Sequence, residues 1–316
     1  GFCSNNLFAD AALFLIFAGI FYYAFREAII TRRKKPTTFG SAEWADLDHL
    51  TNNKLIGSNG FSLGVFETRE GAYPLCYTGD RHLMTIAPTR SGKGVSSIIP
   101  NLLTYQGSAV VIDPKGENAM ITALRRGKGD AKRGIQGLGQ TVHVVDPWGI
   151  TGLPSSCFNP LDWLNPDDPD INENAMILAD SLIAQNAGGY GHDQFWNEEA
   201  KALLMGVLLW VALDEDEKEN RTMGRVRDII SMGAKELNGL LAKMSNHTNH
   251  IIKGAGARTL SKEEKLQSSV LAALQSHTHF LDSPSIRASL ATSDFRFEDL
   301  KTTKMTVYLV LPADRL

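Results

Sequence analysis

The sequence predicts an α/β protein in which helices cover a parallel sheet, with a membrane helix before the sheet and an all-helical segment inserted into it. Three observations lead to this prediction. Apolar runs of strand length alternate with helix-compatible segments, long helical patterns follow from about residue 165, and one more strand-like run comes after them. Such alternation is typical of parallel sheets, because parallel strands need long crossover connections.

The composition limits the class of protein. A chain of 316 residues, 43% hydrophobic and 21% charged, can bury a sizeable core and suggests two domains. The net charge of -3 excludes a protein whose whole surface binds polyanions, although it leaves room for a local basic surface. Only three cysteines occur, far apart and without a CxxC pair, so neither a disulfide framework nor a zinc ribbon is expected.

The N-terminal segment is apolar. Residues 11 to 25, AALFLIFAGIFYYAF, carry no charge, and the run extends back to Leu7 except at Asp10. Its length is close to the ~20 residues that cross a bilayer. We therefore predict a transmembrane helix over about residues 7–26, inside a membrane anchor of residues 1–35 whose basic flank, TRRKK, stays cytoplasmic. A buried core helix is the alternative; a signal peptide would carry its positive charge before the apolar run.

The α/β domain that contains the sheet is predicted in two parts, a first part at 36–165 and a second, truncated part at 296–316. Each expected strand is a short apolar run that ends in proline. The runs are HLMTIAP (82–88), GSAVVIDP (107–114), TVHVVDP (141–147) and KMTVYLVLP (304–312).

Between these parts lies the predicted inserted all-α domain, residues 166–295. Its helices are expected where apolar residues recur at three and four spacing, over 174–187, 195–213 and 262–277. The apolar stretch ALLMGVLLWVAL (202–213) is too short to cross a membrane and is predicted to be a core helix. Ser261 and Glu264 have the spacing of a capping box at the start of the last helix.

The segment TIAPTRSGKGVSSIIP, residues 85–100, has the pattern of a phosphate-binding loop between a strand and a helix. Backbone N–H groups and the positive end of the helix would hold an anion, and Lys93 would supply the positive charge for the outer phosphates, which also makes it a catalytic candidate. Ala87 replaces the usual first glycine, which is a minor departure. The residues predicted to bind nucleotide are Thr89, Arg90, Ser91, Gly92, Lys93, Gly94 and Val95.

Gly94 stands where the general pattern has a hydroxyl that binds Mg²⁺, so the metal ligands cannot be assigned from this loop. Ser96 and Ser97 lie beyond that position. Asp113 and Asp146 each end a predicted strand, at the sheet edge where ligands of open α/β sheets collect. Asp113 is a candidate for binding Mg²⁺ or orienting water, against a purely structural role. Asp146 is interpreted as a turn initiator before a proline.

The segment RRGKGDAKRG, residues 125–134, holds five basic residues and one acid. Two interpretations stay open: a contact with a nucleic-acid backbone, or an ordinary solvated loop.

Several segments taken together resemble the TraG family of type IV secretion coupling proteins. The resemblance covers nearly the whole chain and includes a Gly after Lys93, as in the family's own loop. Besides the membrane helix, the matching segments are FGSAEWA (39–45), APTRSGKGVSSIIPNLL (87–103), VVIDPKGE (110–117), VDPWG (145–149), FNPLDWL (158–164), FWNEEAKALL (195–204) and VYLVLPADRL (307–316).

This resemblance implies an ATPase that binds ATP and Mg²⁺, with a RecA-like P-loop motor domain, anchored in the bacterial inner membrane with the bulk of the chain cytoplasmic. It further implies a homo-hexamer that presents DNA or a DNA–relaxase complex to the channel proteins of a type IV secretion system. The family's acidic metal-coordinating motif comes later than any segment found here, so the chain is expected to be the N-terminal portion and to lack half of the hydrolytic apparatus.

Two other functions fit parts of the sequence. A docking subunit that binds substrate and channel without hydrolysis would explain Gly94 and the missing acidic motif. A soluble small-molecule kinase would also open with a phosphate-binding loop, but it needs neither a membrane helix nor a large helical insert.

Overall fold

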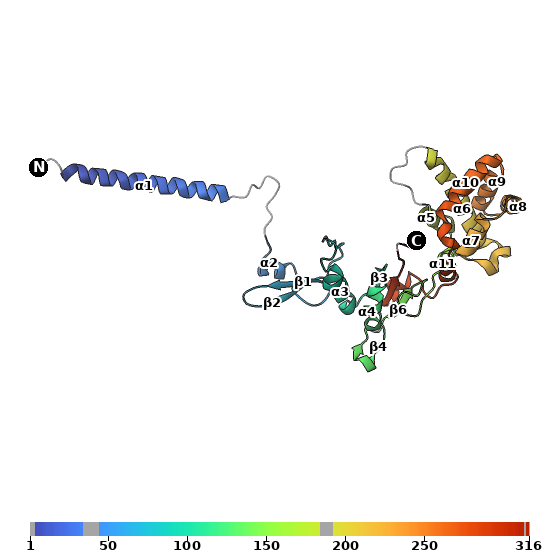
Figure 1. Cartoon of the computed structure of the whole chain (residues 1–316), viewed down its shortest axis with the longest axis horizontal. Helices are drawn as coiled ribbons and strands as arrows, with labels where there is room; N and C mark the ends of the chain where they lie inside the picture. Colours follow the sequence, from blue (N-terminus) through green and yellow to red (C-terminus); the bar gives the residue numbers. More distant parts are fainter. Residues whose placement is uncertain (1–3, 34–43, 184–191, 313, 316) are drawn as a thin grey trace. The chain divides into compact units, whose positions relative to one another are not determined.

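The computed structural model describes residues 4–33, 44–183, 192–312 and 314–315 (Figure 1). The chain divides into two compact units, Gly1–Ser58 with Val65–Tyr77, and Asn59–Gly64 with Thr78–Leu316. The end of the predicted basic flank, the start of FGSAEWA and the end of the helix predicted over 174–187 lie outside the described residues.

The first unit begins with the helix α1 (Ser4–Arg33), which forms where the N-terminal helix was predicted. Its large apolar side chains from Leu13 to Phe25 are exposed. Taken over the residues that the structure describes, none of the helices combines the length and the apolar character needed to cross a bilayer. The helix is therefore confirmed, whereas its prediction as a transmembrane span is not. The unit also contains α2 (Leu47–Asn52), which Asp46 caps, and the strand β2 (Ala72–Tyr77), which pairs with β1 (Phe61–Glu67).

The second unit contains a three-stranded parallel sheet in the order β3-β7-β6. Its strands are β3 (Ala109–Ile112), β6 (Thr141–Val145) and β7 (Met305–Leu309). All three were expected from their apolar runs, and the parallel pairing is confirmed. The central strand β7 comes from the far end of the chain, so the sheet does resume after the helical segment.

The strand predicted over 82–88 is wrong. No regular structure forms there, and Leu83, Met84 and Ile86 are 47%, 85% and 87% exposed. An apolar run becomes a strand only where a neighbouring strand accepts and donates its backbone hydrogen bonds. Within the described residues β3 pairs only with β7, and no partner takes up the backbone of 82–88.

Side chains of alternate residues form two cores, one on each face of the sheet. Val144 and Tyr308 pack with Leu102 of α3 (Ile99–Thr104) and Ala119 of α4 (Glu117–Arg126) on one face. On the other face Met305 and Val307 pack with Phe295, Phe158 and Phe297. The sheet is therefore covered by α3 and α4 on one side and by the segment around Phe295 on the other.

Arg126, the last residue of α4, is fully buried (0% exposed) and joins several elements. Its guanidinium donates to the carbonyls of Leu102, Tyr105 and Gly107 and to the side chains of Gln140 and Thr306. Burial lowers the pKa of this group, because a charge loses solvation away from water. Five hydrogen bonds to neutral acceptors offset that cost and fasten the end of α3 to the start of β7.

The second large segment is a helical block around α6 (His192–Leu213). The core-helix prediction for 202–213 is confirmed, since Leu204, Leu208 and Val211 are fully buried. Helices form at all three expected places, 174–187, 195–213 and 262–277; the first ends at Leu182, and residues 184–187 lie outside the described residues. The block's helices are α5 (Ile171–Leu182), α6, α7 (Met223–Ile230), α8 (Ala234–Met244), α9 (His250–Leu260), α10 (Glu264–His277) and α11 (Pro284–Ser289).

Short elements complete the fold. Short helical turns lie at η3 (Pro160–Trp163), η4 (Glu215–Asn220), η5 (His279–Asp282) and α12 (Asp299–Thr302). The capping box expected at Ser261 is wrong, because Ser261 is the C-cap of α9, which ends at Leu260, and the Ser261 hydroxyl donates to the Arg258 carbonyl. Helix α10 begins at Glu264 without a side-chain cap.

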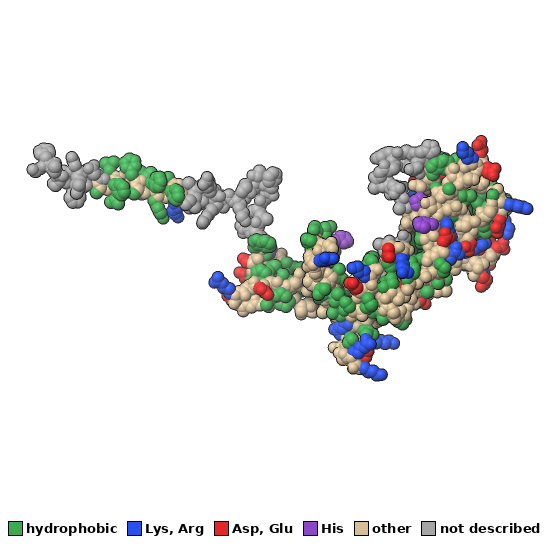
Figure 2. Space-filling model, in the orientation of Figure 1, with side chains coloured by type: hydrophobic (Ala, Val, Ile, Leu, Met, Phe, Trp, Pro, Cys, Tyr) green, Lys and Arg blue, Asp and Glu red, His purple; other side chains and the backbone are tan. Residues whose placement is uncertain are grey.

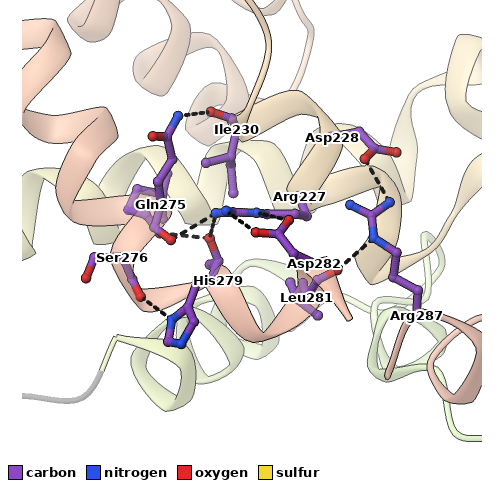
Figure 3. Close-up of polar contacts among 11 residues, drawn as sticks. Arg227, Asp228, Ile230, Gln275, Ser276, His279, Leu281, Asp282 and Arg287 are labelled. Carbon is purple, nitrogen blue, oxygen red and sulfur yellow. Dashed lines mark hydrogen bonds and ion pairs between the residues drawn. The ribbon is translucent and has the colours of Figure 1, made fainter. Parts of the chain in front are cut away.

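Ion pairs tie the helices of the block together. Figure 3 shows Arg227 of α7 donating from Nε and Nη2 to the two carboxylate oxygens of Asp282, at 2.8 and 2.6 Å. Nearby, Arg287 pairs with Asp228 at 2.8 Å. On α6 the buried carboxylate of Glu199 pairs with Arg258 and Lys262 of the α9 end. Burial alone would raise the pKa of Glu199, but the hydrogen bonds from Lys262 and Arg258 outweigh it and hold the pKa below its usual value.

Candidate nucleotide-binding site

The predicted phosphate-binding loop turns sharply at Pro88 to Ser91, where the Ser91 N–H donates to the Pro88 carbonyl at 3.3 Å. Arg90 has φ 65° and Gly92 has φ 85°, both in the left-handed region. Glycine enters that region freely, whereas an arginine there is strained. Gly92 therefore has a backbone reason to be glycine, and Arg90 stores strain in an exposed loop.

The helix after the loop begins as a π-helix, η1 (Gly94–Ile98), and continues as α3. Pro100 lacks an N–H and its ring crowds the carbonyl four residues earlier, which accounts for the wider first turn. The N–H groups at the start of any helix have no partner inside it. The Ser96 N–H already donates to the Gly92 carbonyl at 2.8 Å. The amides of Gly94 and Val95 are therefore the ones placed to bind an anion, with the positive end of the helix dipole behind them.

Lys93 folds back over the loop. Its Nζ donates to the Ala87 carbonyl at 2.7 Å and to the Pro88 carbonyl at 2.9 Å. The ammonium therefore lies across the same loop whose amides would hold a phosphate, instead of extending into solvent.

The space around Gly92 and Gly94 is open. A Cβ built on Gly92 or Gly94 would meet no atom within 4 Å, so the loop faces open space. Lys93 and Gly94 are half-buried, while the other predicted nucleotide-binding residues, Thr89, Arg90, Ser91, Gly92 and Val95, are exposed. An anion could reach the loop directly.

Asn101 anchors the helix behind the loop, and the sequence analysis missed it. Its side-chain amide is buried, donates to the Ser62 carbonyl at 2.9 Å and accepts from the Ser62 N–H at 2.6 Å. This pairing copies a backbone ladder and fixes α3 against the start of β1. A polar residue inside an apolar helical pattern was the only signal that pointed to it.

Asp113 and Asp146 lie at the ends of β3 and β6, as expected from the sequence. Asp113 is buried, and its Oδ2 accepts from the Ala119 N–H of α4 at 2.8 Å. Those contacts are typical of a carboxylate that fixes a helix start, and its catalytic role stays a prediction. Asp146 accepts from the N–H groups of Ile150 and Thr151, so its interpretation as an organiser of the following turn is confirmed.

The loop provides no side-chain ligand set for a metal. Gly94 has no hydroxyl, and the Ser96 hydroxyl donates to the Gly92 carbonyl at 2.9 Å. Among the described residues, no three His, Cys, Asp or Glu side chains gather into a group that could hold a metal ion.

Comparison with known proteins decides the family. Residues 33–316 match the family described as Type IV secretory system Conjugative DNA transfer. The chain belongs to this family. The resemblance to TraG-type coupling proteins that the sequence motifs suggested is thereby confirmed.

Two curated relatives illustrate the match. The conjugal transfer protein TraG of Escherichia coli is 27% identical over 289 residues, covering 83% of this chain and 43% of TraG. The protein VirD4 of Rhizobium radiobacter is 28% identical over 239 residues, covering 74% of this chain and 32% of VirD4. The chain thus spans less than half the length of either relative.

Among solved structures, the bacterial conjugative coupling protein TrwBdeltaN70 is similar with a TM-score of 0.47 and 13% identity. The match covers 72% of this chain and 44% of that structure.

Proposed function

We propose that the chain is the nucleotide-binding portion of a coupling protein that uses ATP to deliver DNA, or a DNA–relaxase complex, to a type IV secretion channel. Membership of a conjugative DNA transfer family supports this proposal. A relative named for conjugal transfer supports it further. Because the chain spans less than half of that relative, the activity, substrate and partners of the whole protein belong to the proposal.

The observation that carries the proposal is the position of Lys93 within the loop. Its Nζ is held by the carbonyls of Ala87 and Pro88, at 2.7 and 2.9 Å, in the same loop as the Gly94 and Val95 amides at the start of η1. When ATP binds, the loop amides would hold its phosphates and Lys93 would exchange the two carbonyls for phosphate oxygens. The same charge would stabilise the transferring phosphoryl group, which makes Lys93 the catalytic residue of the proposal.

The loop offers amides and an ammonium group for the phosphates of ATP, but no side-chain ligand for Mg²⁺ at Gly94. Mg²⁺ keeps several waters and binds largely through substrate phosphates, so it would enter with the nucleotide and neutralise phosphate charge. The loop contributes no hydroxyl at Gly94.

Nucleotide binding by the full-length protein tests the loop assignment. Lys93→Ala should weaken ATP binding by about 10- to 100-fold, the value of a hydrogen-bonded charge. Lys265→Ala, which removes an exposed lysine of α10, serves as the control and should leave the affinity unchanged. Equal ATP affinity of Lys93→Ala and the parent in an equilibrium titration would refute the assignment.

The proposal includes attachment to the bacterial inner membrane through α1, with the bulk of the chain in the cytoplasm, and assembly into a hexamer with a RecA-like motor domain. The exposed apolar side chains from Leu13 to Phe25 support membrane attachment, because exposed apolar surface of this extent favours a lipid or protein partner. Flotation with liposomes should be lost when residues 4–33 are deleted. A mass measurement of the detergent-solubilised full-length protein, with nucleotide and DNA, should show six subunits.

A non-hydrolytic docking subunit remains the second candidate function. Two observations favour it: Gly94 removes the usual metal hydroxyl, and the Asp113 carboxylate is already bonded to the Ala119 N–H. The two functions differ in turnover. DNA-stimulated release of phosphate by the full-length parent, abolished in Lys93→Ala, would exclude docking alone; no turnover with intact DNA binding would favour it.

A further inference from the structure

A small hairpin separates α4 from β6. It consists of β4 (Gly129–Asp130), a turn η2 (Ala131–Arg133) and β5 (Ile135–Gln136), with β4 and β5 antiparallel. This is the segment whose five basic residues left two interpretations open, a nucleic-acid contact or a solvated loop. Neither the family match nor the nucleotide site accounts for it.

The structure divides the five basic residues into two groups. Arg125 donates from Nε to the Leu103 carbonyl at 3.1 Å and from Nη1 to the Gln136 carbonyl, so it braces the hairpin against α3. Arg126 is buried, and its guanidinium donates inward to Leu102, Tyr105, Gly107, Gln140 and Thr306. These two arginines are structural.

The remaining three cations lie exposed on the hairpin: Lys128, Lys132 and Arg133. Figure 2 shows blue side chains, of Lys and Arg, gathered around the place of the segment labelled β4 in Figure 1. Within the described part of the chain, Lys128 and Lys132 make no ion pair. Arg133 is 70% exposed and meets Asp130 at 3.4 Å, an exposed contact that is worth little.

Hydrogen bonds and close backbone packing order the backbone that carries these cations. The Asp130 carboxylate accepts from the N–H groups of Lys132 and Arg133, at 2.9 and 3.3 Å, which orders the tip. At the base, the N–H groups of Leu138 and Gly139 donate to the carbonyls of Arg125 and Gly127. A Cβ on Gly129 or Gly137 would overlap the opposite strand, so only glycine allows this close pairing.

Three exposed cations against one carboxylate form a basic projection on a chain whose net charge is -3. The ligand that suits it carries several anionic groups in a row. The hairpin, residues 127–139, has no aromatic side chain on which a base could stack, so it offers contacts to phosphates and none to bases.

We propose that this hairpin binds the phosphate backbone of the transferred DNA, independently of its sequence. The inference rests on the proposed function in taking DNA as the cargo. It adds the contact surface, with Lys128, Lys132 and Arg133 as the phosphate-binding side chains and Asp130 as the residue that orders them.

The experiment compares two triple variants of the full-length protein that lose the same charge. K128Q/K132Q/R133Q alters the hairpin, and K235Q/K253Q/K265Q alters three exposed lysines of the helical block. Binding to a mixed-sequence single-stranded oligonucleotide is measured over a range of salt concentrations. The hairpin variant should reduce the salt slope by about 2, which is about 0.7 for each lost phosphate contact, while the control variant keeps the parent slope and both keep ATP binding.

A single substitution, D130N, gives the opposite prediction. The Asn side-chain oxygen still accepts from the Lys132 and Arg133 N–H groups, while one negative charge disappears. DNA binding should therefore become tighter, and this variant needs no loss of structure to be informative.

The outcomes separate the inference from the proposed function. A parent that binds no DNA would sink both. If the parent binds DNA, and K128Q/K132Q/R133Q and D130N both bind it with the parent's affinity and salt slope, the hairpin inference alone would be overturned. If K128Q/K132Q/R133Q loses binding to phosphatidylglycerol vesicles but binds DNA like the parent, the surface contacts the membrane instead. That result would also overturn the hairpin inference.

Discussion

The helical block and the loop segment of residues 82–98 are stabilised in opposite ways. The block has a continuous core of fully buried side chains along α6, and its buried charges are paired. The loop segment leaves Met84, Ile86 and Val95 at 85%, 87% and 76% exposed. Apolar side chains are thus packed together in the helical block, whereas those of the loop segment remain exposed to solvent.

This difference separates stability from function within one chain. Segments with few buried contacts open and rearrange at low free-energy cost, and ligand-binding loops are drawn from them. The helical block cannot rearrange as cheaply, because its core is close-packed and the loss of even one methylene there costs stability. Substitutions in the two regions should therefore have effects of different size.

The largest expected effect is in the core of α6. Leu208→Ala removes a fully buried side chain (0% exposed) and should lower the free energy of unfolding by about 2–5 kcal/mol. Ile86→Ala removes a side chain that is 87% exposed and should change it by less than about 0.5 kcal/mol. Urea unfolding followed by circular dichroism measures both. Similar losses in the two variants would break the comparison.

A smaller effect is expected at the buried charge of the block. Glu199→Gln leaves the Lys262 ammonium, whose side chain is 11% exposed, without its carboxylate and should cost about 1–3 kcal/mol. The matched control is Glu215→Gln, because Glu215 meets Lys218 at 3.9 Å with both side chains largely exposed. That substitution should cost less than about 1 kcal/mol. A cost for Glu199→Gln no larger than the control's would show that the buried pair does not stabilise the block.

The smallest effect concerns the sheet and sharpens the comparison through pH. Burial lowers the pKa of His143 on β6, against the opposing charge of Asp294. The unfolded chain binds a proton at about pH 6.5, whereas folded His143 stays neutral to lower pH. The contribution of His143 to the free energy of unfolding is therefore complete above the pKa of the unfolded chain. It is lost as the pH falls below that value toward the lower pKa of the folded state.

The melting temperature should thus fall between about pH 7 and pH 5 in the parent and fall less in His143→Asn. The ring contacts Phe295 at a centroid distance of 4.8 Å and its Nδ1 lies 3.1 Å from the Ser156 hydroxyl, so Asn keeps a polar partner for that hydroxyl. Parallel pH profiles for parent and variant would contradict the assignment to His143.

Much of the fold could be predicted from the sequence. The strands at 107–114, 141–147 and 304–312 form where their apolar runs lie, and the segment between the last two is helical. These elements bury their own side chains, so local pattern and final structure agree. The run at 82–88 has the same texture but no pairing partner among the described strands, and pairing is not a local property.

The candidate site shows the same division. The turn at Gly92 and the helix that follows Lys93 could be predicted from spacing, because loop geometry depends on neighbouring residues. Nucleotide binding by these residues stays a prediction. Asn101 could not, since its partner Ser62 lies 39 residues away. The five basic residues of 125–134 were indistinguishable in sequence; only the structure shows that Arg125 and Arg126 are internal braces.

Arg126 also has a mechanical consequence. One guanidinium is bonded to Leu102 and Tyr105 at the C-terminal end of α3 and to Thr306 in β7. The helix that follows the loop therefore cannot shift at that end without breaking these bonds or pulling the central strand with it. A displacement of α3 that begins at the loop would therefore be transmitted through the hydrogen bonds of Arg126 to β7, the strand that follows the helical block.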